Sequence, residues 1–110
     1  MIIEKLIDRC QQALAATDAL MASLLEAMRA ALSAAPGEAS AKDVGATLQR
    51  EQARAHGFAW ASTYARALRE MLGWAQRLHA ANRLGELEAL LLQAAYAEYL
   101  AQLEIGRAHV

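Results

Sequence analysis

Apolar side chains recur at steps of three and four residues along most of this chain, and this spacing constrains the fold more than any other feature. Residues three and four apart share one face of an α-helix, so each such run predicts a helix with one buried stripe. The runs predict three helices, at about 3–34, 46–80 and 86–103. We therefore expect an all-α fold, either a three-helix antiparallel bundle or an open helical hairpin with a third helix laid across it.

The composition of the chain favours the same fold class. Alanine and leucine together make up about two-fifths of the 110 residues, whereas β-branched and aromatic residues are few. Alanine and leucine have high helix propensity, and strands are enriched in the residue types that are scarce here. With 56% hydrophobic residues the chain has far more apolar material than a disordered segment. It is expected to fold as one small helical domain.

The first predicted helix ends before Pro36. Proline disfavours helical geometry in the residue before it, and Gly37 readily adopts positive φ. A loop is expected from there to about residue 45, with Asp43 or Thr47 as a candidate N-cap of the second helix. Within the first helix Asp18 is expected to be a tolerated buried residue. The apolar stripe consists of Ile3, Leu6, Ile7, Cys10, Leu14, Thr17, Met21, Leu24, Leu25, Met28 and Leu32.

The second predicted helix contains two glycines, Gly57 and Gly73. Each costs roughly 1 kcal/mol relative to alanine inside a helix, so each is expected to mark a close helix crossing or a kink. Arg66 and Glu70 are spaced as an i,i+4 ion pair on a solvated face. The stripe expected to face the core consists of Leu48, Ala55, Ala59, Trp60, Tyr64, Leu68, Met71, Ala75 and Leu78.

A short reversal separates the second and third helices. Asn82 suits the left-handed residue that follows many helices, and the short connection predicts antiparallel neighbours. The third helix opens with Glu86 and Glu88, which complement the positive end of the helix dipole. Its apolar residues lie nearly all round the helix, so the other two helices cannot cover all of them. The residues expected to form an interface with a missing surface are Leu92, Tyr96, Tyr99, Leu100 and Leu103.

Charge and hydropathy exclude two classes of partner. The net charge is −1 with acidic and basic residues interspersed, so we expect neither nucleic acid nor an anionic membrane to bind. No apolar run reaches the roughly 20 residues that a transmembrane helix needs. The N-terminus lacks the pattern of a secretory signal, so we expect a cytoplasmic protein.

No constellation of residues predicts a catalytic, cofactor-binding or metal site. His56 and His79 lie far apart and no Glu-x-x-His pair occurs, so a di-iron site lacks its ligands. The glycines are isolated and form no phosphate-binding loop. Cys10 is the single cysteine and falls on the apolar stripe of the first helix, where a buried, inert thiol is expected.

Five short motifs in the second half of the chain carry a family resemblance. It covers about half the chain and no single motif is diagnostic. The motifs are His56-Gly57-Phe58-Ala59-Trp60, Thr63-Tyr64 with Ala67-Leu68-Arg69, Trp74-Ala75-Gln76-Arg77-Leu78, Gly85-Glu86-Leu87-Glu88, and Glu98-Tyr99-Leu100-Ala101-Gln102-Leu103. Together they resemble the N-terminal helical extension of certain bacterial acyl-CoA dehydrogenase family flavoenzymes, with the methylsuccinyl-CoA dehydrogenases as the nearest subgroup.

The resemblance implies a function for a longer parent protein. Enzymes of this family remove a proton from Cα and a hydride from Cβ of an acyl thioester, giving an enoyl-CoA and reduced FAD, and pass electrons to an electron-transferring flavoprotein. Their base and their flavin and CoA sites lie in later domains, so no catalytic or FAD-binding residue is carried over. Residues 1–103 would then be an assembly and docking segment, with the remainder of its own chain or a second copy as partner. The alternative is a free-standing helical dimerisation or protein-binding module.

The last seven residues, 104–110, are expected to be a non-native read-through tail. Glu-Ile-Gly-Arg-Ala-His-Val can be encoded by GAGATCGGAAGAGCACACGTC, which resembles the start of a common sequencing-library adapter read in frame. Such added segments are excluded from fold reasoning. Arg107 and His109 are therefore given no functional role.

Overall fold

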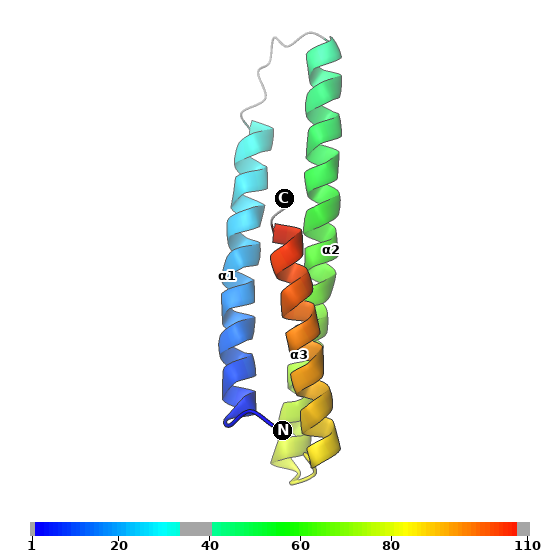
Figure 1. Ribbon diagram of the computed structural model, residues 1–110. Coiled ribbons are helices and arrows are strands. Elements are labelled where there is room, and N and C mark those ends of the chain that lie inside the picture. The colour runs from blue at the N-terminus through cyan, green and yellow to red at the C-terminus, as the bar shows by residue number, and fades with distance from the viewer. Residues whose placement is uncertain (1, 34–40, 108–110) are drawn as a thin grey trace.

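Three helices run up, down and up along one long axis (Figure 1). The computed structural model describes residues 2–33 and 41–107. Helix α1 spans Leu6–Ser33, α2 spans Ala41–Ala80 and α3 spans Glu86–Arg107. Helix α2 is antiparallel to both of its neighbours, and no strand occurs in the two described ranges. The predicted all-α, three-helix antiparallel bundle is confirmed.

The helices differ greatly in length, and this difference decides where the core lies. The 40 residues of α2 correspond to about 60 Å of helix, and the 22 residues of α3 to about 33 Å. Helix α3 therefore accompanies only about half of α2, as Figure 1 shows. The molecule measures 62 × 19 × 17 Å. Three-helix packing is confined to the end of the rod where α3 lies.

The buried core is contributed by all three helices in this three-helix half. Leu68 and Ala75 of α2 and Leu92 of α3 have no exposed surface. Aliphatic side chains of this kind stabilise the fold by roughly 1.5 to 3 kcal/mol each when fully buried. The other buried apolar residues are Leu6, Cys10, Leu14, Ala61, Leu72, Ala89, Tyr96 and Leu103.

The stripe predicted on α2 is only partly correct. Leu68 and Ala75 are buried, but Ala55, Ala59 and Trp60 are exposed. At the same level of α2, Ala61 is buried. Steps of four residues overshoot the 3.6-residue turn of an α-helix, so the predicted stripe drifts off the buried face toward Ala55 and Ala59. Leu48 lies outside the residues whose side chains are described.

Helix α2 begins earlier than predicted, and α3 ends later than predicted. Helix α2 begins at Ala41 rather than near residue 46, so Asp43 and Thr47 lie inside the helix and the prediction that one of them caps it was wrong. Helix α3 continues beyond residue 103 to Arg107. The break predicted at Pro36-Gly37 falls in residues 34–40, outside the described ranges.

The turn between α2 and α3 is closed as Asn82 predicts. Asn82 has φ 61°, and its N–H donates to the carbonyl of His79 at 3.0 Å. The N–H of Arg83 donates to the carbonyl of Leu78 at 2.7 Å. These two bonds form a Schellman motif, which satisfies carbonyls at the end of a helix and reverses the chain.

An ion pair joins α1 to α2 at the surface, and two other polar contacts each form within a single helix. Asp18 was expected to be buried, but it is exposed and accepts a hydrogen bond from the guanidinium of Arg69 at 2.5 Å. Asp18 ends up in solvent because it lies at the edge of the stripe, next to the buried Thr17. The Thr17 hydroxyl donates to the Ala13 carbonyl at 2.9 Å. The predicted pair between Arg66 and Glu70 forms at 2.8 Å.

Gly73 does not lie at a close helix crossing. A Cβ added there would meet only the Arg77 guanidinium, at 3.3 Å, and no atom of another helix within 4 Å. We therefore expect Gly73→Ala to raise the free energy of unfolding by up to about 1 kcal/mol, because alanine has the higher helix propensity and Arg77 is free to move aside. Urea denaturation of the two proteins measures the difference. A loss of stability would contradict this placement of Gly73.

Candidate docking surface

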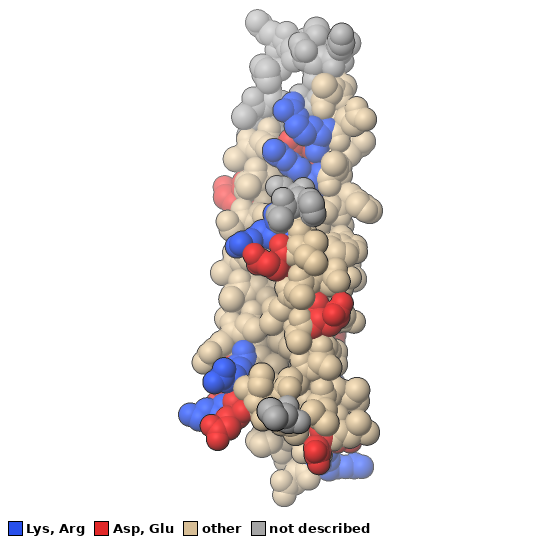
Figure 2. All heavy atoms as spheres, viewed as in Figure 1, with Lys and Arg blue, Asp and Glu red and all other residues tan. Residues whose placement is uncertain are grey.

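One side of α3 carries apolar residues that the bundle leaves exposed. Leu87 is 64% and Leu91 50% exposed, and Ala94 and Ala101 are also exposed. Together with the exposed Glu98 these residues follow one another at steps of four and three along the helix. We call Leu87, Leu91, Ala94, Glu98 and Ala101 the outer seam of α3. Figure 2 shows the surface over α3 as mostly uncharged, interrupted by separate acidic side chains.

The outer seam borders a groove between α2 and α3. The groove has a volume of about 650 Å³, and its floor and walls include Met71 and Trp74 of α2 and Leu91 and Tyr99 of α3. Its two charged residues are Glu70 and Glu98, both acidic. Open apolar surfaces of this kind are typical of protein–protein contact sites. The groove is therefore suited to an apolar helix or loop more than to a small polar substrate.

The five residues predicted as interface candidates lie mostly in the core. Leu92 is fully buried, Tyr96 is 4% and Leu103 5% exposed, and Tyr99 and Leu100 are half-buried. Their packing partners are the other two helices of the same chain. The exposed apolar surface of α3 is instead the side that carries Leu87 and Leu91. As an interface, the predicted set remains a prediction.

Aromatic side chains of α2 and α3 make two edge-to-face contacts, one within α2 and one between the two helices. The rings of Trp60 and Tyr64 pack edge to face with centroids 4.6 Å apart, and those of Tyr64 and Tyr99 with centroids 5.1 Å apart. Edge-to-face pairs are a favoured packing geometry for aromatic side chains. Trp60 also lies against Gly106, where an added Cβ would meet the indole at 3.2 Å. The exposed Trp60 is therefore partly covered by the end of α3.

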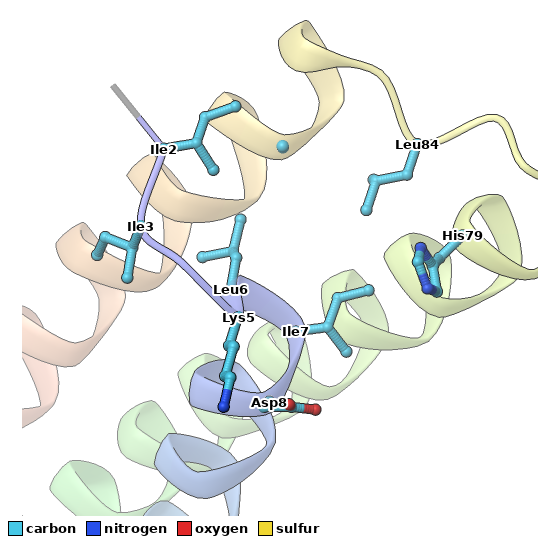
Figure 3. Close-up of a pocket in the computed structure, with 9 residues that line it drawn as sticks. Ile2, Ile3, Lys5, Leu6, Ile7, Asp8, His79 and Leu84 are labelled. Atoms are coloured by element: carbon cyan, nitrogen blue, oxygen red, sulfur yellow. The ribbon is translucent and has the colours of Figure 1, made fainter.

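A smaller pocket lies at the end of the rod where the chain begins. It has a volume of about 400 Å³ and is lined by the N-terminal segment, the start of α1 and the turn between α2 and α3. Figure 3 shows Leu6, Ile7 and Leu84 converging on it, with His79 across the opening on α2. The N–H of Ile3 donates to the Gln93 carboxamide at 2.7 Å and holds the segment against α3. Lys5, Asp8 and His79 also line the pocket, and the rest of its lining is apolar.

The titratable side chains of the described residues do not gather into a reactive cluster. No three His, Cys, Asp or Glu residues in this part of the chain are placed to hold a metal ion. His56 and His79 are both exposed, and they lie about 35 Å apart along α2. His79 lies in the last turn of α2.

Two buried ionisable groups lie close together inside the bundle. Burial raises the pKa of the Cys10 thiol from 9.0 to about 11. Burial also raises the pKa of the Tyr96 hydroxyl, which donates to the Leu68 carbonyl at 2.7 Å. Both groups are therefore neutral in the folded protein at neutral pH. The predicted burial of Cys10 is confirmed, and its lack of reactivity remains a prediction.

These pKa shifts predict that alkaline pH destabilises the fold. The unfolded chain ionises Cys10 near pH 9 while the folded chain holds the proton until about pH 11. Stability is therefore intact below pH 9 and falls as the pH rises toward 11, by up to about 2 kcal/mol from Cys10 alone. Urea denaturation at pH 8 and pH 10.5 measures the loss, and Cys10→Ala should lose less than the parent chain. Equal stability at the two pH values would contradict the prediction.

The chain offers no fit for FAD in the residues described. A dinucleotide needs backbone N–H groups that can cradle its phosphates, usually from a glycine-rich loop at a helix N-terminus. Gly45, Gly73 and Gly106 lie within helices, and Gly85 immediately precedes the acidic first turn of α3. The buried side-chain oxygen without a partner is a carboxylate oxygen, on Glu51, which would repel a phosphate. We therefore assign no FAD contact to these residues.

Within the described ranges, no helix combines the length and apolar character needed to cross a bilayer.

Fold and surface together define an all-α bundle whose most prominent feature is an apolar face of one helix rather than a chemical site. The chain is similar to (2S)-methylsuccinyl-CoA dehydrogenase of Cereibacter sphaeroides, with 44% identity over 96 residues, or 83% of this chain. The chain spans 17% of the length of that relative. No protein-family model and no solved structure matches the chain. The resemblance to the acyl-CoA dehydrogenases that residues 56–103 predict is confirmed.

Proposed function

We propose that this chain is the helical docking segment of an FAD-dependent acyl-CoA dehydrogenase that oxidises a methylsuccinyl-CoA-like thioester. The 44% identity with a dehydrogenase of that name carries the proposal. In the parent enzyme, FAD would be bound outside these residues and electrons would pass to an electron-transferring flavoprotein. The segment would not be catalytic by itself, and the parent would work in the cytoplasm.

The docking role is supported by the surface of α3. Leu87 and Leu91 are exposed on the side of the helix that faces away from the core. Leaving a leucine in water forgoes roughly 1.5 to 3 kcal/mol of burial, so a second surface that covers both would bind with a substantial gain. The match covers only 17% of the relative. The remaining part of such an enzyme could provide the surface that covers the two leucines.

The enzymatic half of the proposal is tested on the complete gene product. The DNA is read past the codon for Leu103 in an independent clone, and the product of the whole frame is purified. We expect bound FAD and oxidation of (2S)-methylsuccinyl-CoA in the presence of an electron acceptor. A frame that encodes no dehydrogenase, or a complete product that neither binds FAD nor oxidises the thioester, would contradict the proposal.

The docking half is tested by hydrogen exchange. Amides of α3 are compared between the 110-residue chain and the complete product. Docking buries the outer seam and raises the free energy of local opening, so exchange in α3 should slow by at least about tenfold in the complete product. Amides near the middle of α1, which is away from the groove, serve as the control. Equal exchange rates in α3 would show that this helix does not dock.

The second candidate is a free-standing helical module that dimerises or binds another protein. The same exposed leucines on α3 favour it, because two copies could bury them against each other. The gene separates the two proposals. A stop codon immediately after Val110, together with a dimer in sedimentation equilibrium, would favour the module over the dehydrogenase segment.

A further inference from the structure

Helix α3 has two apolar seams rather than one. The inner seam faces the bundle and consists of Ala89, Leu92, Tyr96, Tyr99 and Leu103, at steps of three and four residues. The outer seam, defined above, repeats at steps of four and three residues on the exposed side. A repeat of alternating threes and fours is the spacing by which one helix packs along another. The outer seam is therefore shaped for a further helix lying along α3.

The size of the outer-seam residues allows such a helix to approach closely. Ala94 lies near the middle of the seam, with Ala101 one heptad further along. Leu91 stands beside them at the rim of the groove, and Met71 and Trp74 of α2 form the opposite wall. Small residues let the axis of a neighbouring helix approach closely, and the larger residues beside them provide side chains for it to pack against.

The charge of the groove decides what kind of helix fits. Glu70 and Glu98 are its charged residues. Glu70 is paired with Arg66 at 2.8 Å, whereas Glu98 accepts a hydrogen bond from the uncharged Gln102 at 3.2 Å. A carboxylate covered by an apolar helix loses hydration, and a cation on that helix would compensate for the loss. The groove therefore complements a helix with a basic side chain opposite Glu98.

A second copy of the outer seam brings no basic side chain to Glu98, because the seam contains none. A parallel copy would also place the two Glu98 carboxylates against each other, whereas an antiparallel copy centred on Ala94 would keep them about 12 Å apart along the helix axis. Like charges that meet in a poorly solvated contact destabilise it. Glu70 of each copy would add further negative charge to the same contact.

We infer that the outer seam and its groove receive one amphipathic helix from the remainder of the dehydrogenase, with apolar side chains on Leu87, Leu91 and Ala94 and an arginine or lysine opposite Glu98. The inference rests on the proposed function, because that function supplies the source of the helix. It adds the position, the secondary structure and the charge of the partner surface.

Site-specific photocrosslinking in the complete gene product tests the inference. Leu91 is replaced by benzoylphenylalanine, which its 50% exposure permits, and the crosslinked peptide is identified by mass spectrometry. We expect one intramolecular crosslink, to a helical segment that lies beyond residue 103 of the complete product and carries a basic residue. Replacement of Ala22, exposed on α1, is the matched control and should give no crosslink to that segment.

Charge variants test the role of Glu98. Glu98→Arg should lower the crosslink yield from position 91 at least about tenfold, whereas Glu98→Gln should lower it less. Glu26→Arg is the control, because Glu26 is an exposed acidic residue of α1 outside the outer seam. Equal crosslink yields in the Glu98→Arg and Glu26→Arg proteins would overturn the inference of a basic partner residue.

The remaining outcomes separate the inference from the proposed function. A crosslink from Leu91 to α3 of a second copy, or no crosslink at all, in a protein that oxidises the acyl-CoA overturns the inference and leaves the function standing. A complete product without dehydrogenase activity overturns the function, and the helix then loses its assigned source.

Discussion

Leu92→Ala should lower the free energy of unfolding by about 3 kcal/mol, within the range of roughly 2 to 5 kcal/mol for leucine-to-alanine changes in cores. Leu92 has no exposed surface and lies on the inner seam of α3. Its truncation removes apolar contacts with the core and leaves a cavity that a rod of only three helices fills poorly. Urea denaturation monitored by circular dichroism, extrapolated to water, measures the loss.

The neighbouring Leu91 provides a matched control. It is the same residue type in the same helix, but half of its surface is exposed. Leu91→Ala should therefore cost less than about 1 kcal/mol in the isolated chain, because little buried area is lost. Equal losses at the two positions would show that the inner and outer seams are assigned to the wrong sides of α3. In the complete dehydrogenase, docking should make Leu91→Ala more costly than it is in the isolated chain.

The helices could be predicted from the sequence because each element has a strong local signal. Apolar residues at steps of three and four predicted α1, and Asn82 predicted the chain reversal that the Schellman motif forms. The start of α2 had no such signal, since polar Asp43 and Thr47 suit a cap and a helix interior alike. Helix ends of this kind depend on packing and on the preceding chain, which residue patterns do not reveal.

The candidate surface was harder to predict than the helices. The all-round apolar character of α3 correctly indicated that part of it would stay uncovered by the bundle. Which part was not evident, because both seams of α3 have helical spacing. The predicted interface included Tyr96 and Tyr99 of the inner seam. Tyr96 is instead buried, and its hydroxyl donates a hydrogen bond to the Leu68 carbonyl. Only the arrangement of three helices in space distinguishes the two sides.

The partial success on α2 has a separate cause. Ala59 and Ala75 share a predicted stripe, but Ala59 is exposed although Ala61, two residues further on, is buried. At about 100° per residue, Ala59 and Ala75 lie on nearly opposite sides of the helix, so the predicted stripe had left the buried face of α2. Substitutions at these two alanines turn the difference into a measurable one.

Ala75→Leu should destabilise the protein by about 1 to 3 kcal/mol, the usual cost of inserting extra methylene groups into a packed core. Ala75 has no exposed surface, and its small side chain lets α2 approach its neighbours closely. A leucine at this position must push a helix outward or adopt a poor rotamer. Urea denaturation measures the change, and a shift of the Trp74 fluorescence, one residue away, would report the displaced packing.

Ala59→Leu is the matched control, since Ala59 is an exposed alanine of the same helix. Leucine and alanine both favour helix, so this substitution should change the free energy of unfolding by no more than about 0.5 kcal/mol. A large cost at Ala59 with none at Ala75 would mean that the buried face of α2 is assigned to the wrong side of the helix. Because the groove is defined by the face of α2 against which α3 packs, that result would also remove the proposed docking surface.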